Sequence, residues 1–336
     1  MWIELASNCD EARLERSLRG LGLWTRRLRD DDGRVGLWVE AHSAPVDPAR
    51  LRALPGVAAV LAPPSPHPRV DGQRGTVVEV AGVRFGGEEP VLLAGPCAAE
   101  SPERMHEAAA LVARAGGRFL RGGAFKPRTS PYAFAGHGRV ALGWVREAAD
   151  AHGLGVVCEV LSEGDAEAVA EASDLVQIGS RNMQNFALLR AVGACGRPVL
   201  LKRGMGARLE EWLLAGEHLL AAGSGPVLFC ERGVRGFDPA TRNLLDLGAV
   251  ATLAHGLGQP VVVDPSHAAG RRDLVLPLGL AGLAAGACGL LVEVHPEPED
   301  ARSDGPQALR PVDWAALARA VRVGAATALS AAPPCG

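Results

Sequence analysis

Lysine is almost absent from this 336-residue sequence. Only two of its 35 basic residues are lysines, Lys126 and Lys202, and the others are arginine. A genome biased towards arginine codons explains the general shortage, but it does not explain why these two lysines persist. Basic and acidic residues nearly balance, 35 against 38, and a net charge of −3 argues against a dedicated nucleic-acid-binding protein.

Long apolar runs and paired cysteines are also missing. No stretch approaches the roughly 20 uninterrupted apolar residues of a membrane span, and the first 20 residues lack the apolar core of a signal peptide. The seven cysteines are scattered and include no CxxC pair, which is typical of reduced thiols. We therefore expect a cytoplasmic protein with no membrane partner and no nucleic-acid partner.

The first 66 residues predict a small βαββαβ, ferredoxin-like domain. We expect its elements in this order: a strand at 2–6, a helix after Asp10, strands at 24–30 and 34–41, a helix from Asp47, and a strand at 57–63. The proline-rich segment 63–70 predicts a stiff, extended linker, and the alternation in 76–87 predicts a β-hairpin.

Residues 67–330 form the second predicted domain and follow a different rhythm. Short, continuous apolar runs alternate with longer helical patterns; the runs are 91–95, 117–122, 154–160, 175–179, 198–202, 226–231, 260–264 and 289–294. Runs without polar alternation are typical of parallel strands that are buried on both faces. Eight such units predict an α/β fold, a (β/α)8 TIM barrel. A Rossmann-type fold is the alternative, but no GxGxxG follows the first run.

Charged residues end most of these predicted strands, where barrels place their active sites. One group is cationic and consists of Arg121, Lys126, Arg128, Arg181, Lys202 and Arg232. So much fixed positive charge around one opening predicts that the group faces anions, since uncompensated cations this close together would repel one another. Phosphates and carboxylates fit, because arginine binds them in a bidentate manner and lysine acts as a point charge or proton donor.

A second group could bind a metal ion. Cys97, His267, Glu293 and Asp304 follow predicted strands 1, 7 and 8, and strands 1 and 8 become neighbours when a barrel closes. A thiolate, an imidazole and two carboxylates suit a borderline divalent ion with an open position for substrate. Each residue has a simpler explanation on its own, such as a buried cysteine or a capping turn. Eight polar strand ends together favour a functional site.

Seven segments resemble the type Iβ 3-deoxy-D-arabino-heptulosonate 7-phosphate (DAHP) synthases. They span residues 75 to 310 in the family's order: VLLAGPCAAES, RGGAFKPRTSPYAF, QIGSRNMQNFALL, PVLLKRG, FCERGVRGF, VVVDPSHAAGRRD and VEVHPEPEDARSDGPQ. The resemblance implies a transferase that condenses phosphoenolpyruvate with erythrose 4-phosphate and releases phosphate, the first step of the shikimate pathway and of aromatic amino acid biosynthesis. The N-terminal domain resembles the regulatory domain that some members carry.

The resemblance also implies roles for the strand-end residues. Cys97, His267, Glu293 and Asp304 would hold a divalent ion, with Mn²⁺ expected and Fe²⁺, Co²⁺ or Zn²⁺ as alternatives. The phosphoenolpyruvate contacts would be Arg121, Lys126, Arg181, Lys202 and Arg232, and the sugar phosphate would lie against Lys126, Arg128 and Thr129. Lys126 is the expected proton donor, and Glu159 and His267 are alternative catalytic groups for the attacking water.

The sequence allows two rival functions, a related synthase and a non-catalytic scaffold, and it leaves the role of the N-terminal domain open. The related 3-deoxy-D-manno-octulosonate 8-phosphate synthases follow their lysine with Ala-Asn-Arg-Ser, whereas this chain continues Pro127-Arg128-Thr129-Ser130. The metal-free members of that family also have asparagine in place of Cys97. A non-catalytic scaffold would have lost some ligands, and none is missing here. The N-terminal domain is expected either to bind an aromatic amino acid effector or to support only a homo-oligomer, a tetramer or dimer.

Overall fold

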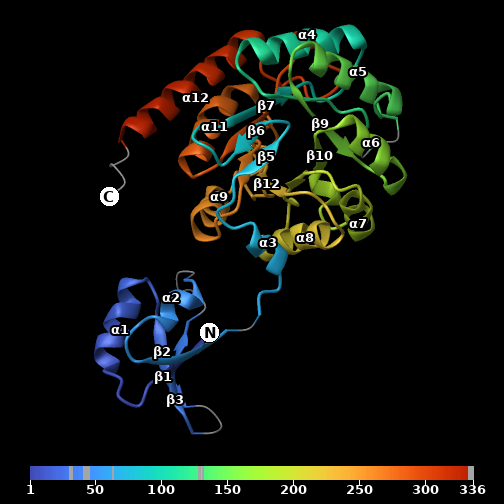
Figure 1. Ribbon diagram of the computed structural model, residues 1–336. Coiled ribbons are helices and arrows are strands. Elements are labelled where there is room, and N and C mark those ends of the chain that lie inside the picture. The colour runs from blue at the N-terminus through green and yellow to red at the C-terminus, as the bar shows by residue number, and fades with distance from the viewer. Residues whose placement is uncertain (30–32, 41–45, 63, 128–129, 131, 332–336) are drawn as a thin grey trace. The chain divides into compact units, whose positions relative to one another are not determined.

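The computed structural model describes residues 1–29, 33–40, 46–62, 64–127, 130 and 132–331. The chain divides into two compact units, Met1–Pro66 and His67–Gly336 (Figure 1). Among the described residues, no helix has the length and apolar character needed to cross a membrane.

The N-terminal unit has the predicted ferredoxin-like order. Its elements are β1 (Trp2–Leu5), α1 (Glu11–Gly20), β2 (Thr25–Arg29), β3 (Val35–Val39), α2 (Pro48–Arg52) and β4 (Val57–Leu61). The antiparallel sheet has the order β2-β3-β1-β4. Helix α1 begins after Asp10, whose side chain accepts the N–H of Arg13, and it buries Leu14 and Leu18 against the sheet.

The proline-rich segment after this unit is not extended throughout, so that prediction was wrong for its second half. Pro68–Gly72 is a short helix, α3, with proline in its first turn. The carboxylate of Glu217 accepts the N–H groups of Arg69 and Val70 at the start of this helix. Val70 is fully buried in the barrel's core. A contact 147 residues away along the chain therefore stabilises a helix that is too short to form by itself.

The predicted hairpin closes one end of the barrel. Strands β5 (Val78–Val80) and β6 (Val83–Phe85) pair antiparallel. Their apolar side chains pack against residues near the starts of the barrel strands, among them Phe119, whose ring centroid lies 5.6 Å from that of Phe85. The hairpin thus fills the barrel interior at the amino-terminal ends of the strands. The carboxyl ends of the strands, at the opposite end of the barrel, remain available for a functional site.

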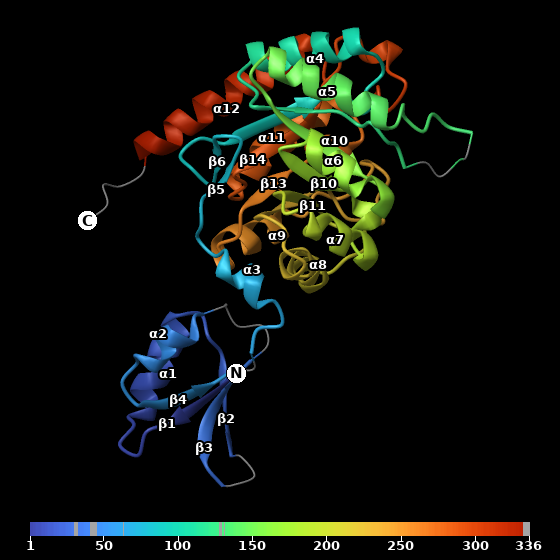
Figure 2. The ribbon, with the colours of Figure 1, turned by 45° about the vertical axis from the view of Figure 1, so that its right-hand side comes forward.

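Eight parallel strands form the closed barrel, which confirms the predicted fold (Figure 2). They are β7 (Val91–Gly95), β8 (Phe119–Arg121), β9 (Gly155–Val160), β10 (Leu175–Ile178), β11 (Val199–Lys202), β12 (Val227–Glu231), β13 (Val261–Val263) and β14 (Gly289–Glu293). Strand β14 pairs with β7, so the first and last strands of the barrel are neighbours. Their side chains are buried almost throughout, which is why each strand appears in the sequence as a continuous apolar run.

Helices surround the strands. They are α4 (Pro102–Arg114), α5 (Arg139–Ala151), α6 (Ala166–Ala172), α7 (Phe186–Ala194), α8 (Leu209–Ala221), α9 (Leu247–Ala251), α10 (Pro265–Ala269), α11 (Val275–Ala284) and α12 (Pro311–Ala331). A π-helical turn, Thr252–Gly256, extends α9, and 3₁₀ turns occupy Glu163–Asp165, Ser180–Asn182, Arg272–Leu274 and Pro298–Asp300. The core between helices and strands includes Trp212 and Trp314, both fully buried.

Candidate active site

One pocket at the carboxyl end of the barrel collects most of the predicted site residues. Its lining comes from seven of the loops and strand ends and consists of Lys126, Pro127, Glu159, Gly179, Ser180, Arg181, Lys202, Met205, Arg232, Arg242, His267 and Asp304. Three further predicted residues, Cys97, Arg121 and Glu293, are nearly fully buried in the same end of the barrel. The predicted sugar-phosphate residues Arg128 and Thr129 lie outside the described residues.

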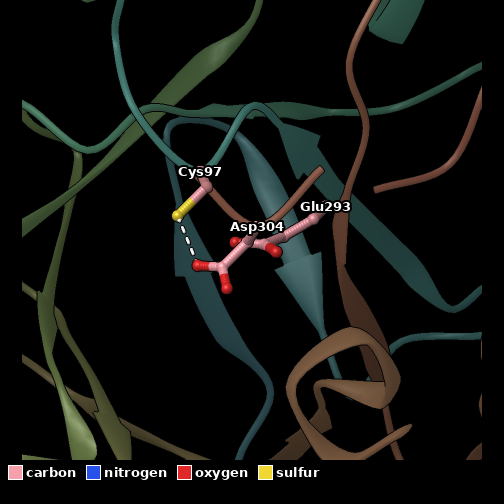
Figure 3. Close-up of side chains that lie close together, drawn as sticks. All are labelled: Cys97, Glu293 and Asp304. Carbon is pink, nitrogen blue, oxygen red and sulfur yellow. Dashed lines mark hydrogen bonds between the residues drawn. The ribbon is translucent and has the colours of Figure 1, made fainter. Parts of the chain in front are cut away.

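Cys97, Glu293 and Asp304 lie together (Figure 3). One ligand atom from each of the three lies within 4.8 Å of the other two. The Cys97 thiol donates to Oδ2 of Asp304 at 3.0 Å. The fourth predicted ligand, His267, is not part of this group of three, but its Nε2 lies 3.4 Å from Oε1 of Glu293. The close group therefore joins β7, β14 and the loop after β14, with the imidazole beside it.

The donor set fits a divalent cation. Burial, reinforced by the Glu293 carboxylate, raises the pKa of the Cys97 thiol to about 12, so the thiol is protonated at neutral pH in the absence of a cation. A bound divalent ion would replace that proton and would balance the two carboxylates beside the sulfur. Sulfur, imidazole and carboxylate oxygens are ligands of zinc and of other borderline metals.

Unusual backbone conformations bring this group together. Asp304 has a φ of +56°, in the left-handed region that few residues other than glycine adopt. At the end of β7, Gly95 has a φ of +150°, and a Cβ added there would lie 2.1 Å from the backbone oxygen of Arg121. Glycine therefore permits the close approach of β7 and β8 that places Cys97 beside Arg121.

Asp264 orients His267. It caps α10, where one oxygen accepts the backbone N–H of His267 at 3.0 Å and the other lies 2.7 Å from its Nδ1. Burial lowers the pKa of His267, which favours a neutral ring with a proton on Nδ1. The free Nε2 then points towards Glu293, as a metal-binding imidazole requires.

The protein's own carboxylates pair with part of the cationic group. Lys202 Nζ contacts Asp264 at 2.5 Å, and Arg121 contacts Glu293 at 2.6 Å. Burial alone would raise the pKa of Asp264, but His267 and Lys202 hold it well below its usual range. Arg121 and Lys202 therefore balance buried carboxylates of the protein itself, and one of these, Glu293, is a candidate metal ligand.

Three other cations of the predicted group, Lys126, Arg181 and Arg232, also line the pocket. Lys126 Nζ donates to the backbone oxygen of Cys97 at 2.8 Å and lines the pocket. Arg232 is 5% exposed, and its Nη1 has no hydrogen-bond partner among the described residues. Burial lowers the pKa of Arg232, with Asp264 acting in the opposite direction. A buried guanidinium nitrogen without a partner is costly, so a bound anion would stabilise it.

Glu159 lines the same pocket and lies near the end of β9. It accepts a hydrogen bond from Gln177 at 3.0 Å. A Cβ added at Gly179 would lie 1.9 Å from Oε1 of Glu159, so this glycine leaves the space that the carboxylate occupies. Both candidates for handling water, Glu159 and His267, reach the pocket.

Several residues around the site had no predicted role. Asp264 caps α10 and also holds Lys202 and His267. Gln307 donates to Glu293, and Arg242 lines the pocket and contacts Asp304. Gln307 is the last residue of VEVHPEPEDARSDGPQ, one of the motifs that carry the family resemblance. This was the only sign in the sequence that Gln307 belongs to the site.

Comparisons with known proteins agree on the family. The model of the DAHP synthetase I family matches residues 72–325. A phospho-2-dehydro-3-deoxyheptonate aldolase of Thermotoga maritima is 50% identical over 234 residues, which cover 70% of this chain and 69% of that protein. A 2-dehydro-3-deoxyphosphooctonate aldolase of Rhodopseudomonas palustris is 33% identical over 265 residues, 72% of this chain and 91% of that protein.

Solved structures match as well. The crystal structure of the phospho-2-dehydro-3-deoxyheptonate aldolase (DAHP synthase) of Thermotoga maritima aligns with a TM-score of 0.77 and 38% identity over 97% of each chain. A truncated form of 3-deoxy-D-arabino-heptulosonate 7-phosphate synthase from the same organism aligns with a TM-score of 0.71 and 43% identity, over 76% of this chain and 94% of that one. The chain belongs to the DAHP synthetase I family.

Proposed function

We propose that this chain condenses phosphoenolpyruvate with erythrose 4-phosphate to give DAHP and inorganic phosphate. The observation that carries this proposal is the position of Cys97, Glu293 and Asp304 beside a pocket lined by Lys126, Lys202 and Arg232, among others. A metal site next to an anion-binding pocket is what the condensation of a phosphorylated enol with an aldehyde needs. The relative at 50% identity carries the name of this activity.

Phosphoenolpyruvate binds among the cations of the pocket. Nη1 of Arg232, which has no hydrogen-bond partner among the described residues, and the ammonium group of Lys202 neutralise its phosphate and carboxylate. Arg181, which is exposed, adds a further positive charge to the lining of the pocket. Arg121, which forms an ion pair with Glu293, adds a further positive charge at the same end of the barrel. The sugar phosphate lies against the segment that contains Arg128 and Thr129, as the family resemblance implies.

The reaction then needs one new carbon–carbon bond. A cation held by Cys97, His267, Glu293 and Asp304 supplies Lewis acidity at the aldehyde carbonyl when it is bound. The electron pair of the C2–C3 double bond of phosphoenolpyruvate forms a bond to the aldehyde carbon, and Lys126 Nζ gives a proton to the resulting alkoxide. The position of Lys126, hydrogen-bonded to the backbone of Cys97, suits this transfer.

Water completes the reaction. Its oxygen bonds to C2 and its proton passes to Glu159 or to His267. The C2 hydroxyl then gives its proton to the departing phosphate as the bond from C2 to the phosphate oxygen breaks, which leaves a ketone and inorganic phosphate. His267 can take the proton only through Nε2, the nitrogen that would also bind the cation, because Nδ1 contacts Asp264.

An assay of both aldehydes tests this function. We expect phosphate release from phosphoenolpyruvate with erythrose 4-phosphate, loss of activity after EDTA treatment, and recovery with Mn²⁺, and we expect Fe²⁺, Co²⁺ or Zn²⁺ to restore less. Turnover only with arabinose 5-phosphate would instead assign the octulosonate activity that the 33% identical relative is named for. No turnover with either aldehyde in the presence of Mn²⁺ would support a non-catalytic barrel.

We further propose that the N-terminal unit, Met1–Pro66, binds an aromatic amino acid and thereby regulates a homo-oligomeric enzyme. Deletion of residues 1–66 should keep the activity and abolish inhibition by Tyr, Phe or Trp, and inhibition that persists would count against the proposal. The deletion should stop before α3, because Val70 belongs to the barrel's core. The described cysteines are free thiols, which supports a reducing compartment, the cytoplasm.

A further inference from the structure

Two side chains outside the proposed ligand set each contact one of the two carboxylate ligands. Gln307 is 3% exposed and donates from Nε2 to Oε2 of Glu293. Arg242, in the loop after β12, donates from Nη1 to Oδ1 of Asp304 at 3.2 Å and to Oε1 of Gln307 at 3.1 Å. Asp304, Arg242, Gln307 and Glu293 therefore form one continuous chain of hydrogen bonds.

Arg242 determines which way the Gln307 amide faces. A glutamine amide has one oxygen that accepts and one nitrogen that donates, whereas a guanidinium only donates. The oxygen of Gln307 must therefore face Arg242, and its nitrogen is directed at Glu293. The other oxygen of Glu293 contacts Arg121 at 2.6 Å and lies 3.4 Å from Nε2 of His267. Both oxygens of this candidate ligand are fixed as a result.

The segment that carries Arg242 is itself attached to the helix that carries His267. The backbone N–H of Arg242 donates to the oxygen of Ala269 at 3.0 Å, and the Asn243 side chain donates to the oxygen of His267 at 2.9 Å. Gly270 ends α10 with a φ of +69°, and a Cβ added there would lie 2.5 Å from Cβ of Arg242. Arg242 is thus held close against α10 while its guanidinium reaches Asp304.

We propose that Arg242 and Gln307 are positioning residues that orient the carboxylates of Asp304 and Glu293 for a divalent cation. The inference rests on the metal site proposed above and extends it beyond the ligands themselves. Residues that hydrogen-bond to metal ligands typically change metal affinity by about 10- to 100-fold when they are replaced. Arginine suits the role, because the two hydrogens of its Nη1 can serve two acceptors at once.

Binding of Mn²⁺ alone to the full chain tests the inference. The free Mn²⁺ signal in electron paramagnetic resonance gives the Kd without substrates, so that a loss of substrate contacts does not affect the readout. We expect R242M and Q307M each to raise the Kd by about 10- to 100-fold. The loss in the double variant should be smaller than the sum of the two single losses, since Arg242 acts on Glu293 only through Gln307.

A nearby arginine provides the matched control. Arg271 pairs with the exposed Asp273 and touches no candidate ligand, so R271M should leave the Kd unchanged. Circular dichroism and the thermal midpoint of each metal-free variant establish that it is folded. A wild-type chain that binds no Mn²⁺ would refute the metal site itself. Wild-type binding with Kd values for R242M and Q307M within twofold of it, or additive losses in the double variant, would refute the positioning role alone.

Discussion

Replacement of Asp264 by asparagine should strongly destabilise the barrel. Asp264 is fully buried, and one of its oxygens contacts both Lys202 at 2.5 Å and Nδ1 of His267 at 2.7 Å. Asparagine has nearly the same shape and can still cap α10 through its oxygen, but its NH2 group then faces Lys202 and Nδ1 of His267, so the substitution removes both the charge and the acceptor of these two contacts. Lys202, only 4% exposed, is then left without its counter-charge.

The expected cost follows from that burial. Removal of one partner from a buried ion pair costs about 3–5 kcal/mol, against at most about 1 kcal/mol for an exposed pair. With a urea m-value of about 3 kcal/mol/M, this corresponds to a midpoint lowered by about 1 to 1.7 M. The second substitution K202M should recover a large part of the loss, because it removes the unpaired charge as well.

Urea unfolding followed by circular dichroism measures these shifts. D273N, in the exposed pair with Arg271, is the control and should leave the midpoint unchanged. A D264N midpoint within 0.3 M of wild type, about 1 kcal/mol on the same m-value, would refute the reasoning. So would a double variant less stable than D264N, since the lysine would then contribute stability without its partner.

Three further outcomes are expected. K126R should keep the thermal midpoint and lose most of kcat, because arginine does not release a proton near neutral pH; near wild-type turnover would exclude Lys126 as proton donor. G179A should displace the Glu159 carboxylate, which would lie 1.9 Å from the added Cβ, lowering kcat and costing about 1–3 kcal/mol in a urea titration. Burial would raise the pKa of Asp246, but the Arg203 guanidinium at 2.8 Å holds it below its usual range. Its carboxylate therefore stabilises the fold above about pH 4 and loses this effect as the pH falls through the lowered pKa. D246N should be less stable than wild type at pH 7 and equal to it near pH 2.

The barrel could be predicted because burial on both faces leaves a pattern in the sequence. Its strands are short runs made mostly of Val, Leu, Ile, Phe or Cys, and a polar residue at or just after the end of most runs marks the carboxyl edge. The helix α3 could not be predicted in the same way. Its one proline, Pro68, and the prolines before it in the sequence favour an extended chain, and the Glu217 carboxylate that stabilises the helix is far away in the sequence.

The site was predictable in its residue types but not in its pairings. Strand ends identified Arg121, Lys202 and Glu293 as polar residues at one edge, yet no spacing shows that Arg121 contacts Glu293 or that Lys202 contacts Asp264. Such pairs depend on which strands are neighbours and on side-chain directions across the opening. Arg242 was indistinguishable from the many other arginines, most of which lie at the surface.

The two buried lysines make the protein unusually simple to study through its amines. Apart from the α-amino group, its only amines are Lys126, which is 8% exposed, and Lys202, which is 4% exposed. A chain labelled with ¹⁵N-lysine should therefore give two side-chain signals in an NMR spectrum, and both should report on the pocket. Conversely, reagents that acylate surface lysines should find little to modify without entering that pocket.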